Sequence, residues 1–545
     1  MEIRPPTVGK GRWHDRCKRE KQVKTTHRRR RRGPATRSSV VAPLFLLASS
    51  LVSSAWAQES GDGGGVDENR SGFWISPRVS LSQTLTNNSP VGSPYARSEQ
   101  VTEISPGVRA YMNLPRIKGS VDYSLAGRFY TQHTYANGLQ HTLDGNATVE
   151  ALDDHGFIDL RGLVDQLSIS PFDPHSTGST QNGNKSQTSL FRFSPYYRGV
   201  AGSAEYELRY AMQSVSTDTA SRSDFTSNGW NFHVVDRNPG QLMGWSFDAS
   251  QQKYDYSLGR DTASSAFKVG LIFPFTSQLT GSLLVGTESN DQLTLAKQSY
   301  RTTELNLEWR PSDRTRMSVG LEKRFFGNGH DIELEHRTAR TVWRYTDSKG
   351  VVSNALEDAL PVLGSYYDLV DSLFSSLEPD PIKRAQLVES ELLRLGLPSR
   401  AELYQRYLTS SATLERNQQL SVLLQGTRGV LTFVLFRNNS RRVDTLFNPG
   451  SDSFDVSSSI QQRGWSVLYA HRLTPLTSFN ASINGIKIAS TNAALGNSLK
   501  TLTFGVTTQL GLRTSGSVQL LHEVFSGTMN PYKVTSITGV ITHRF

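Results

Sequence analysis

From residue 72 to the C-terminus, apolar and polar side chains alternate in long segments separated by short polar stretches. Val121–Tyr130 is one such segment. In another, Leu305, Leu307 and Trp309 alternate with Glu304, Asn306 and Glu308. Because successive side chains of a strand point to opposite faces of its sheet, each segment is predicted to be a strand with one apolar and one polar face.

Two all-β architectures produce this alternation, a soluble sandwich and a membrane barrel. Strands of sandwiches run about 5–6 residues, in domains of about 100 residues. Here longer segments follow one another through residues 72–545 without a dividing linker. Strands that cross a membrane need about 9–11 residues, with apolar side chains outward and polar ones inward. The sequence therefore predicts an all-β fold: a transmembrane antiparallel up-and-down β-barrel of about 20 strands, within a range of 16–22.

Turn composition predicts which segments share an end of the barrel. Short, tight turns at 274–277, 310–314 and 474–477 are typical of periplasmic turns, whereas longer stretches rich in Ser, Gly, Asn and Asp at 87–97, 171–186, 216–223 and 446–454 are typical of extracellular loops. Five strands are expected between the turns at Pro311 and Pro475. An antiparallel barrel requires an even number there, so either one strand assignment near the helical stretch described next is wrong or that stretch carries the chain across the barrel.

A helical pattern interrupts the strands within 353–408, mainly near 360–408. Apolar residues share one helical face in 366–377. Asp380 and Pro381 then offer an N-cap and a first helical residue for a second amphipathic stretch, which ends at Gly396. Ser399 and Glu402 have capping-box spacing for a third short helix. A cap, a periplasmic knob and a plug in the lumen remain open, and a self-packed surface hairpin is the favoured interpretation.

The first 57 residues are predicted to be a basic leader that ends in a signal peptide. Five arginines at 28–32 precede an apolar run at 40–52 and a small-residue site, so cleavage is expected between Ala57 and Gln58. This leader holds 14 of the 59 basic and 3 of the 49 acidic residues, so 45 basic and 46 acidic residues remain. The net charge of +10 thus belongs to the leader, and we expect no nucleic-acid partner.

Residues 58–71 are rich in Gly and acidic residues and are predicted to be a flexible lead-in to a barrel over 72–545. The only cysteine is Cys17, so disulfides and thiolate metal sites are excluded beyond the leader. Large aromatic residues near strand ends are interpreted as interfacial girdles: Trp230, Trp245, Phe273, Trp309, Trp465 and Tyr532.

The candidate functional residues are charged side chains on the polar faces of the strands, which are predicted to line the lumen: Arg128, Glu205, Glu207, Arg209, Glu304, Glu308, Arg324 and Arg544. A barrel of 16 or more strands leaves an aqueous interior unless it is plugged. Mixed charge there allows either weak ion selectivity or pairing that stiffens the wall. No dinucleotide-binding, P-loop or zinc-protease motif is present, so neither a catalytic residue nor a cofactor or metal is expected.

The last segment, Tyr532–Phe545, resembles the closing strand of bacterial outer-membrane barrels, in which a terminal aromatic residue such as Phe545 belongs to the signal read by the assembly machinery. Further motifs are similar to the PEP-CTERM system-associated outer-membrane proteins: WISPRVSLSQTLTNN (74–88), EISPGVRA (103–110), SISPF (168–172), SPYYR (194–198), HRTARTVW (336–343) and the helical stretch 380–397. The resemblance implies an outer-membrane barrel linked to exosortase and exopolysaccharide loci in Gram-negative bacteria. It carries over no functional residue.

The expected function is a non-enzymatic conduit or scaffold for exopolysaccharide export or surface assembly, located in the outer membrane. Its expected partners are outer-membrane lipid, the barrel assembly machinery and exopolysaccharide or its export proteins. A general diffusion porin is the first alternative. The second is a barrel hydrolase with a histidine at the rim, for which the candidates are His336, His471, His522 and His543. A receptor with an N-terminal plug domain is disfavoured, because strands begin soon after Gln58.

Overall fold

The computed structural model describes most of the chain from residue 72 onward. The described residues are 72–175, 183–219, 224–236, 242–258, 260–352, 407–409, 411–443, 453–528 and 530–545, with 370, 371, 374, 378, 384, 387, 388 and 390–392 of a helical insert. The predicted signal peptide, its cleavage site at Ala57–Gln58 and the lead-in 58–71 lie outside these residues. The fold below belongs to the unit Val66–Phe545.

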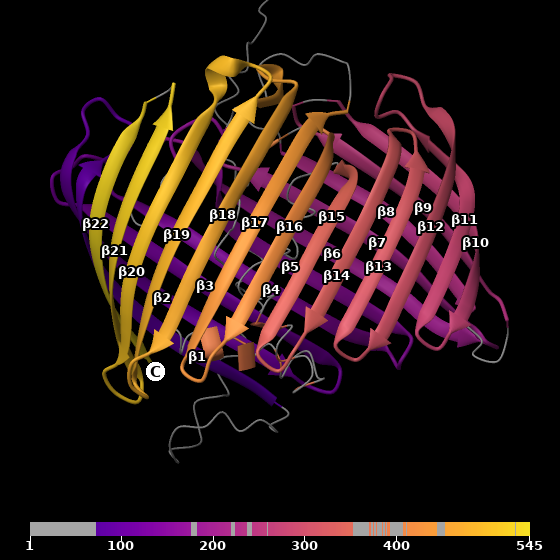
Figure 1. Cartoon of the computed structure of the whole chain (residues 1–545), viewed down its shortest axis with the longest axis horizontal. Helices are drawn as coiled ribbons and strands as arrows, with labels where there is room; N and C mark the ends of the chain where they lie inside the picture. The colour runs from indigo at the N-terminus through magenta and orange to yellow at the C-terminus, as the bar shows by residue number, and fades with distance from the viewer. Residues whose placement is uncertain are drawn as a thin grey trace, which may run out of the picture. The chain divides into compact units, whose positions relative to one another are not determined.

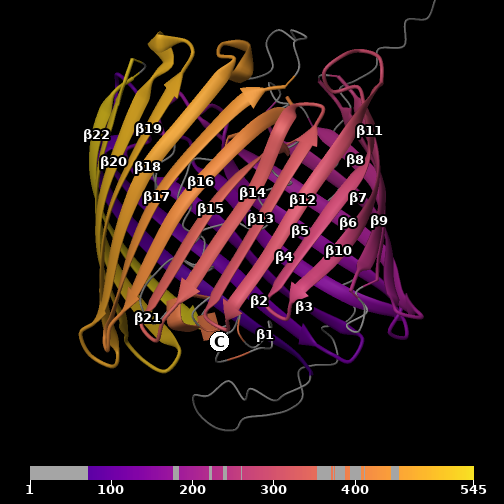
Figure 2. The ribbon, with the colours of Figure 1, turned by 45° about the vertical axis from the view of Figure 1, so that its right-hand side comes forward.

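Twenty-two antiparallel strands form one closed barrel (Figures 1 and 2). The first eleven are β1 Gly72–Ser89, β2 Arg97–Asn113, β3 Ile117–Tyr130, β4 Gly138–Leu152, β5 Gly156–Ser168, β6 Lys185–Ala201, β7 Ala204–Thr217, β8 Phe225–Asp236, β9 Gly244–Tyr256, β10 Thr262–Thr276 and β11 Leu279–Asn290. The others are β12 Gln298–Ser312, β13 Thr315–Arg324, β14 Gly327–Arg337, β15 Thr341–Val352, β16 Thr413–Gln425, β17 Gly429–Arg442, β18 Ser459–Arg472, β19 Thr477–Ser490, β20 Asn497–Gln509, β21 Thr514–Gly527 and β22 Tyr532–Arg544.

Each strand pairs with its neighbours in the sequence, and β22 closes the barrel on β1. The closing register runs from Arg78 opposite Arg544 to Thr86 opposite Ser536. The amide of Phe545 donates a hydrogen bond to the carbonyl of Pro77 at 3.0 Å. The predicted up-and-down topology is confirmed, with 22 strands at the upper limit of the expected range. Closure leaves no free sheet edge, which is the requirement for a sheet in lipid.

The region with the inconsistent strand count contains a tight hairpin between β13 and β14. Its turn runs from Arg324 to Gly327, and Gly327 has a φ of +100°, a conformation that residues with a Cβ rarely adopt. Six strands, β13 to β18, therefore lie between the turns at Pro311 and Pro475, so the expectation of five was wrong.

The two faces of the wall follow the predicted alternation. On β12, Leu305 is 50% exposed on the outer surface, while Glu304 on the opposite parity pairs with Lys268 of β10. Trp309 and Trp465 are likewise exposed on the outer face. An outer surface this rich in exposed apolar side chains is typical of a lipid-facing barrel. Tyr532 is an exception among the predicted girdle residues, because it is buried on the inner face, where it stacks on Phe525.

The turns and loops separate to opposite ends of the barrel. The connections after β10, β12 and β18, which contain the predicted short turns, lie at the same end as the C-terminus. The predicted long loops follow β1, β5, β7 and β17 at the other end. We call these the turn end and the loop end. Short 3₁₀ helices, η2 Ser453–Asp455 and η3 Ala493–Leu495, lie in two loop-end connections.

Candidate functional site in the barrel lumen

All eight predicted lumen residues lie on the parity opposite the exposed apolar side chains. On β7, for example, Leu208 and Met212 face outward, so Glu205, Glu207 and Arg209 face inward. The structure brings some of the eight together. Arg209 bonds Glu207 of its own strand at 2.9 Å. Arg128 instead pairs with Glu103 of β2 at 2.6 Å. Glu308 and Arg544 lie near the turn end of their strands.

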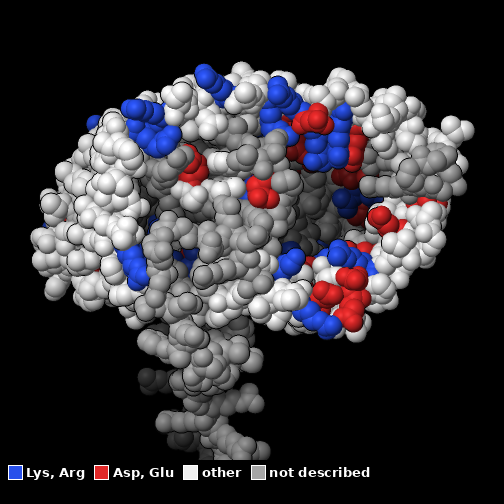
Figure 3. Space-filling view, turned by 90° about the horizontal axis from the view of Figure 1, so that it is seen from below, with Lys and Arg blue, Asp and Glu red and all other residues white. Residues whose placement is uncertain are grey.

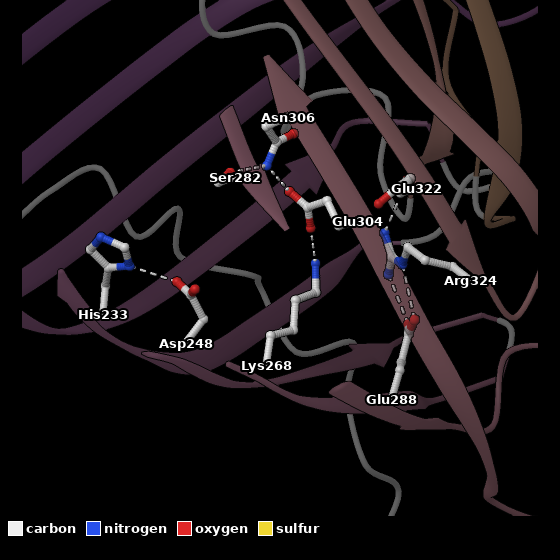
Figure 4. A network of polar contacts seen from close by, with 9 residues as sticks. All are labelled: His233, Asp248, Lys268, Ser282, Glu288, Glu304, Asn306, Glu322 and Arg324. Atoms are coloured by element: carbon white, nitrogen blue, oxygen red, sulfur yellow. Dashed lines mark hydrogen bonds and ion pairs between the residues drawn. The ribbon is translucent and has the colours of Figure 1, made fainter. Parts of the chain in front are cut away.

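A polar network covers the inner wall of β8 to β13 (Figure 4). Lys268 Nζ contacts Glu304 Oε2 at 2.6 Å, and the amide of Asn306 donates to the other oxygen of the same carboxylate at 2.9 Å. Arg324 grips Glu288 with two hydrogen bonds of 2.8 and 2.9 Å, a bidentate geometry that only a guanidinium provides. Glu304 and Glu288 are thus each paired with a neighbouring cation.

Similar pairs continue along the inner wall of β1 to β7. Asp122 of β3 accepts hydrogen bonds from both Arg78 and Arg109, each with a contact of 2.6 Å. Arg161 pairs with Asp144, and Arg209 reaches Asp159 at 2.7 Å. Figure 3, a view onto the turn end, shows a recess with Lys, Arg, Asp and Glu side chains around it. These pairs join strands that are one or two places apart in the barrel, so they stiffen the wall as well as line the lumen.

A second sector of the inner wall, over β18 to β22 and β1, is lined mainly by neutral hydroxyl and amide groups. Ser80 and Thr542 lie 2.9 Å apart across the closing seam, as do Thr84 and Thr538. Further members of this sector are Ser466, Asn484, Ser482, Thr501, Thr503, Ser517 and Ser536. Hydroxyl and amide groups both donate and accept hydrogen bonds, so this sector suits an uncharged polar solute.

The helical insert enters the barrel and packs on its inner wall near the turn end. Val370, Val388 and Leu392 of the insert share one buried cluster with inward-facing residues of β15 to β18: Val342, Leu423, Val430, Val434, Leu468 and Ala470. Most of these wall residues lie close to the turn ends of their strands. Figures 1 and 2 show the helical pieces at that end, beside the C-terminus. Within the insert, Arg384 bonds Asp371 at 2.8 Å.

The insert begins and ends at the loop end, because it connects Val352 of β15 to Thr413 of β16. Its described residues Val370, Val388 and Leu392 nevertheless lie near the turn end. The returning residues Tyr407 and Leu408 lie at the loop end again. Leu408 packs with inward residues of β5 to β9, whereas Tyr407 packs with Ile460 and Ile488 on β18 and β19. The two adjacent side chains thus contact two different parts of the wall.

The connection between β5 and β6 also folds across the loop end. Phe172 joins the cluster of Tyr407, Phe454, Ile460 and Ile488. The amide of Asn497, on β20, donates hydrogen bonds of 3.0 Å to the carbonyls of Pro171 and Phe172. This connection is therefore fastened to strands that are far from β5 in the barrel order.

The favoured interpretation of the insert as a self-packed surface hairpin was wrong for its described residues. Their buried contacts are with the lumen wall. A signal for this was present in the sequence. Between Leu420 and Phe436, apolar residues occupy both parities of β16 and β17, for example Val422 outward and Leu423 inward. A strand that is apolar on both faces must be covered on both. Sequence reasoning missed that the second cover is the insert.

The four rim histidines lie on the outer face. His336, His522 and His543 each contact the hydroxyl of a threonine on the adjacent strand at 2.8–2.9 Å, and His471 contacts Tyr469 at 3.0 Å. Among the contacts recorded for the described residues, none of these four rings meets a carboxylate that could orient it as a catalytic base. The described residues contain no group of three or more His, Cys, Asp or Glu placed to hold a metal ion. They also include no helix with the length and apolarity needed to cross a bilayer.

No family model matches the chain, and no curated protein matches it. Solved structures with a similar course of the chain include the FrpB iron transporter from Neisseria meningitidis (F5-1 variant), at 8% identity and a TM-score of 0.46 over 86% of this chain and 82% of that one. Others are the siderophore receptor PirA from Pseudomonas aeruginosa, at 8% identity and a TM-score of 0.38 over 86% and 80%, and the copper transporter OprC, at 9% and 0.43 over 88% and 81%.

Proposed function

We propose that this protein is a non-enzymatic outer-membrane conduit, closed by its own insert, that serves exopolysaccharide export or surface assembly in a PEP-CTERM system. The observation that carries the proposal is the insert, which is held against the inner wall near the turn end and again at the loop end. An insert held against the inner wall at both ends of the lumen would have to rearrange before a large solute passes.

The orientation follows from the lengths of the connections. In outer-membrane barrels, short turns face the periplasm and long loops face the outside. We therefore place the turn end and Phe545 in the periplasm, and the Phe172–Tyr407 cluster at the cell surface. An export substrate would first meet the helices packed on β15 to β18, and then the aromatic cluster at the mouth.

The lining supports an uncharged polar substrate. The hydroxyl and amide sector over β18 to β22 and β1 offers exchangeable hydrogen bonds. On the wall of β8 to β13, Glu304 and Glu288 are already paired with Lys268 and Arg324. The donors and acceptors that line a pore govern what it conducts. A sugar chain could exchange its own hydroxyl bonds along this sector without displacing a charge pair.

The general diffusion porin is the alternative that the structure makes testable. A porin has an open aqueous lumen, so it should conduct steadily without any change in the insert. The plugged conduit should conduct little until the insert leaves the wall. The hydrolase is less well supported, because the candidate histidines face outward and their polar contacts are with threonine or tyrosine hydroxyls.

A reversible cross-link distinguishes the conduit from the porin. Residues 58–545 contain no cysteine, so cysteines placed at Val388 and Leu423, both members of the buried cluster, would be the only thiols of the mature chain. A short thiol-specific cross-linker joins the insert to β16, and a reductant releases it. Secretion of exopolysaccharide by cells that carry only this variant should stop on cross-linking and return on reduction. A single V388C variant treated identically is the control.

Two outcomes count against the proposal. Normal exopolysaccharide secretion in a deletion strain would remove the export role. Large, steady single-channel currents from the cross-linked protein in a planar bilayer would establish an open porin and remove the closed state. Silent channels before reduction that open afterwards would support the conduit.

A further inference from the structure

Three cations lie directly opposite one another on the outer face of β17, β18 and β19. Arg437 is the register partner of Arg463, and Arg463 is the register partner of Lys487. All three side chains are exposed, and they share the outward parity of Leu435 and Trp465. Figure 1 shows these three strands side by side on one wall. We call these three residues the basic row.

The basic row has no carboxylate partner among the described residues. The recorded neighbour of Arg437 is an amide: with its oxygen turned toward the guanidinium, Gln461 accepts bonds of 3.1 and 2.7 Å. Two other outward cations differ in this respect. Lys253 pairs with Asp255 at 2.6 Å, and Arg416 with Asp347 at 2.7 Å. Like charges directly opposite each other on a sheet repel, so the row is unfavourable unless an anion lies over it.

The position of the row indicates where that anion comes from. One step toward the turn end, the outward positions are Leu435, Trp465 and Gly485, and the lipid-facing apolar band begins there. The indole of Trp465 lies against the backbone of β19, since a Cβ built on Gly485 would be 2.8 Å from Nε1. Lys500 stands opposite Gly485 and adds a fourth exposed cation. Tryptophan beside cations is typical of the level of lipid headgroups.

We propose that the basic row is a binding site for the phosphate groups of a lipid headgroup in the leaflet at the loop end. The two guanidiniums can each offer paired N–H donors to phosphate oxygens, and the ammonium of Lys487 adds a point charge. The acyl chains of the same lipid would lie on Leu435, Phe433 and Ile483 below the row. The site is on the outer wall, so it does not depend on what passes through the lumen.

The test compares the full barrel with a variant in which the row is neutral, R437Q/R463Q/K487Q. The probe is lipid A with two phosphates, added to the protein in a zwitterionic detergent, and native mass spectrometry counts the bound lipids. We expect the variant to bind about tenfold more weakly or worse, since each cation contributes to the attraction of anionic lipid. The matched control K253Q/R301Q/K323Q removes three other outward cations and should bind like the wild type. Retained heat-modifiable migration on gels shows that each variant folds.

Thermal melting provides a second test, because lipid A should reverse the order of the two melting temperatures. Without lipid A, neutralising the row removes repulsion, so the variant should melt at a higher temperature than the wild type. With saturating lipid A the order should invert. Inorganic phosphate at the same phosphate concentration should not reproduce the inversion, and if it does, the site takes free phosphate and not a lipid. Equal lipid A binding by the wild type and R437Q/R463Q/K487Q would overturn the proposal.

Discussion

The amide of Leu408 donates a hydrogen bond of 2.9 Å to the carbonyl of Ser168, and Tyr407 forms a parallel β-bridge with the same serine. This link joins the end of the insert to the last residue of β5. Next to this link, the side chain of Leu408 packs on β5 to β9, and the side chain of Tyr407 packs on β18 and β19. The end of the insert is thus bonded to one part of the wall and packed on another, and we infer that it closes the loop end.

Truncating the two aromatic residues of this closure should open the loop end. In F172A/Y407A, two buried rings are lost from one cluster, and each loss costs about 3–5 kcal/mol of packing where the site cannot collapse. We expect more frequent and longer openings in single-channel recordings. The control F433A/Y469A removes a Phe and a Tyr from the outer face and should leave the gating unchanged. Identical recordings from the two double variants would contradict the closure.

The contact at the turn end can be tested independently. Leu392 is 1% exposed between the insert and the wall, so L392D places an unpaired charge in an apolar cluster. The insert should leave the wall while the barrel keeps its strand hydrogen bonds. We expect faster proteolysis within 353–406 with an unchanged melting temperature of the barrel. The control S390D changes an exposed residue of the same helical stretch. A fall in barrel stability without faster cleavage would show that the insert is not separable.

The sequence was sufficient for the wall, because the wall depends on local alternation. Strands such as β12 and β22 were predicted from the period of two, and the eight charged residues lie on the inward parity because the same period fixes their side. A two-residue link such as the hairpin at Arg324–Gly327 carries almost no polar loop signal, so the number of strands is harder to predict than their faces. The number of strands depends on recognising every such link, so one error was enough to make the expected count odd.

The position of the insert could not be predicted by the same means. Its helices were recognised from the spacing of residues such as Val388 and Leu392, but their partners Val342 and Leu468 lie far away in the sequence. Helical spacing shows that a face must be buried, and it does not show against what. The pairing of charges could not be predicted from the sequence for a similar reason. Glu304 meets Lys268 only because of the register of three strands, β10 to β12.

Glu288 and Arg324 are each expected to stabilise the wall only when the other is present. The side chain of Glu288 is 3% exposed and receives both bonds of the guanidinium. R324Q leaves that carboxylate without its partner, which costs about 3–5 kcal/mol for a fully buried charge and less for this partly hydrated site. In E288Q/R324Q no charge is stranded, so we expect part of the loss to be recovered. Urea unfolding of the four proteins of the cycle gives the coupling, and strict additivity would show that the two side chains act separately.

His175, in the connection between β5 and β6, should make closure of the loop end sensitive to acid. Burial lowers the pKa of His175 to about 4, and the positive charge of Lys185 acts in the same direction. The ring lies 3.2 Å from the hydroxyl of Ser168, and the carbonyl of His175 accepts a hydrogen bond from Tyr532. The packed connection therefore holds a neutral imidazole, whereas the same ring in an opened connection would titrate near 6.5.

The sign follows from these two pKa values. Above pH 6.5 both states carry a neutral ring, and the packed connection has its full stability. As the pH falls from 6.5 to 4, the opened state binds a proton that the packed state does not, so opening becomes easier by up to roughly 3 kcal/mol. Hydrogen exchange of residues 168–185 should accelerate over this range in the wild type. In H175Q the side chain stays neutral at every pH, so the acid-induced part should vanish. An equal acceleration in H175Q would assign the effect to the carboxylates of the lumen instead.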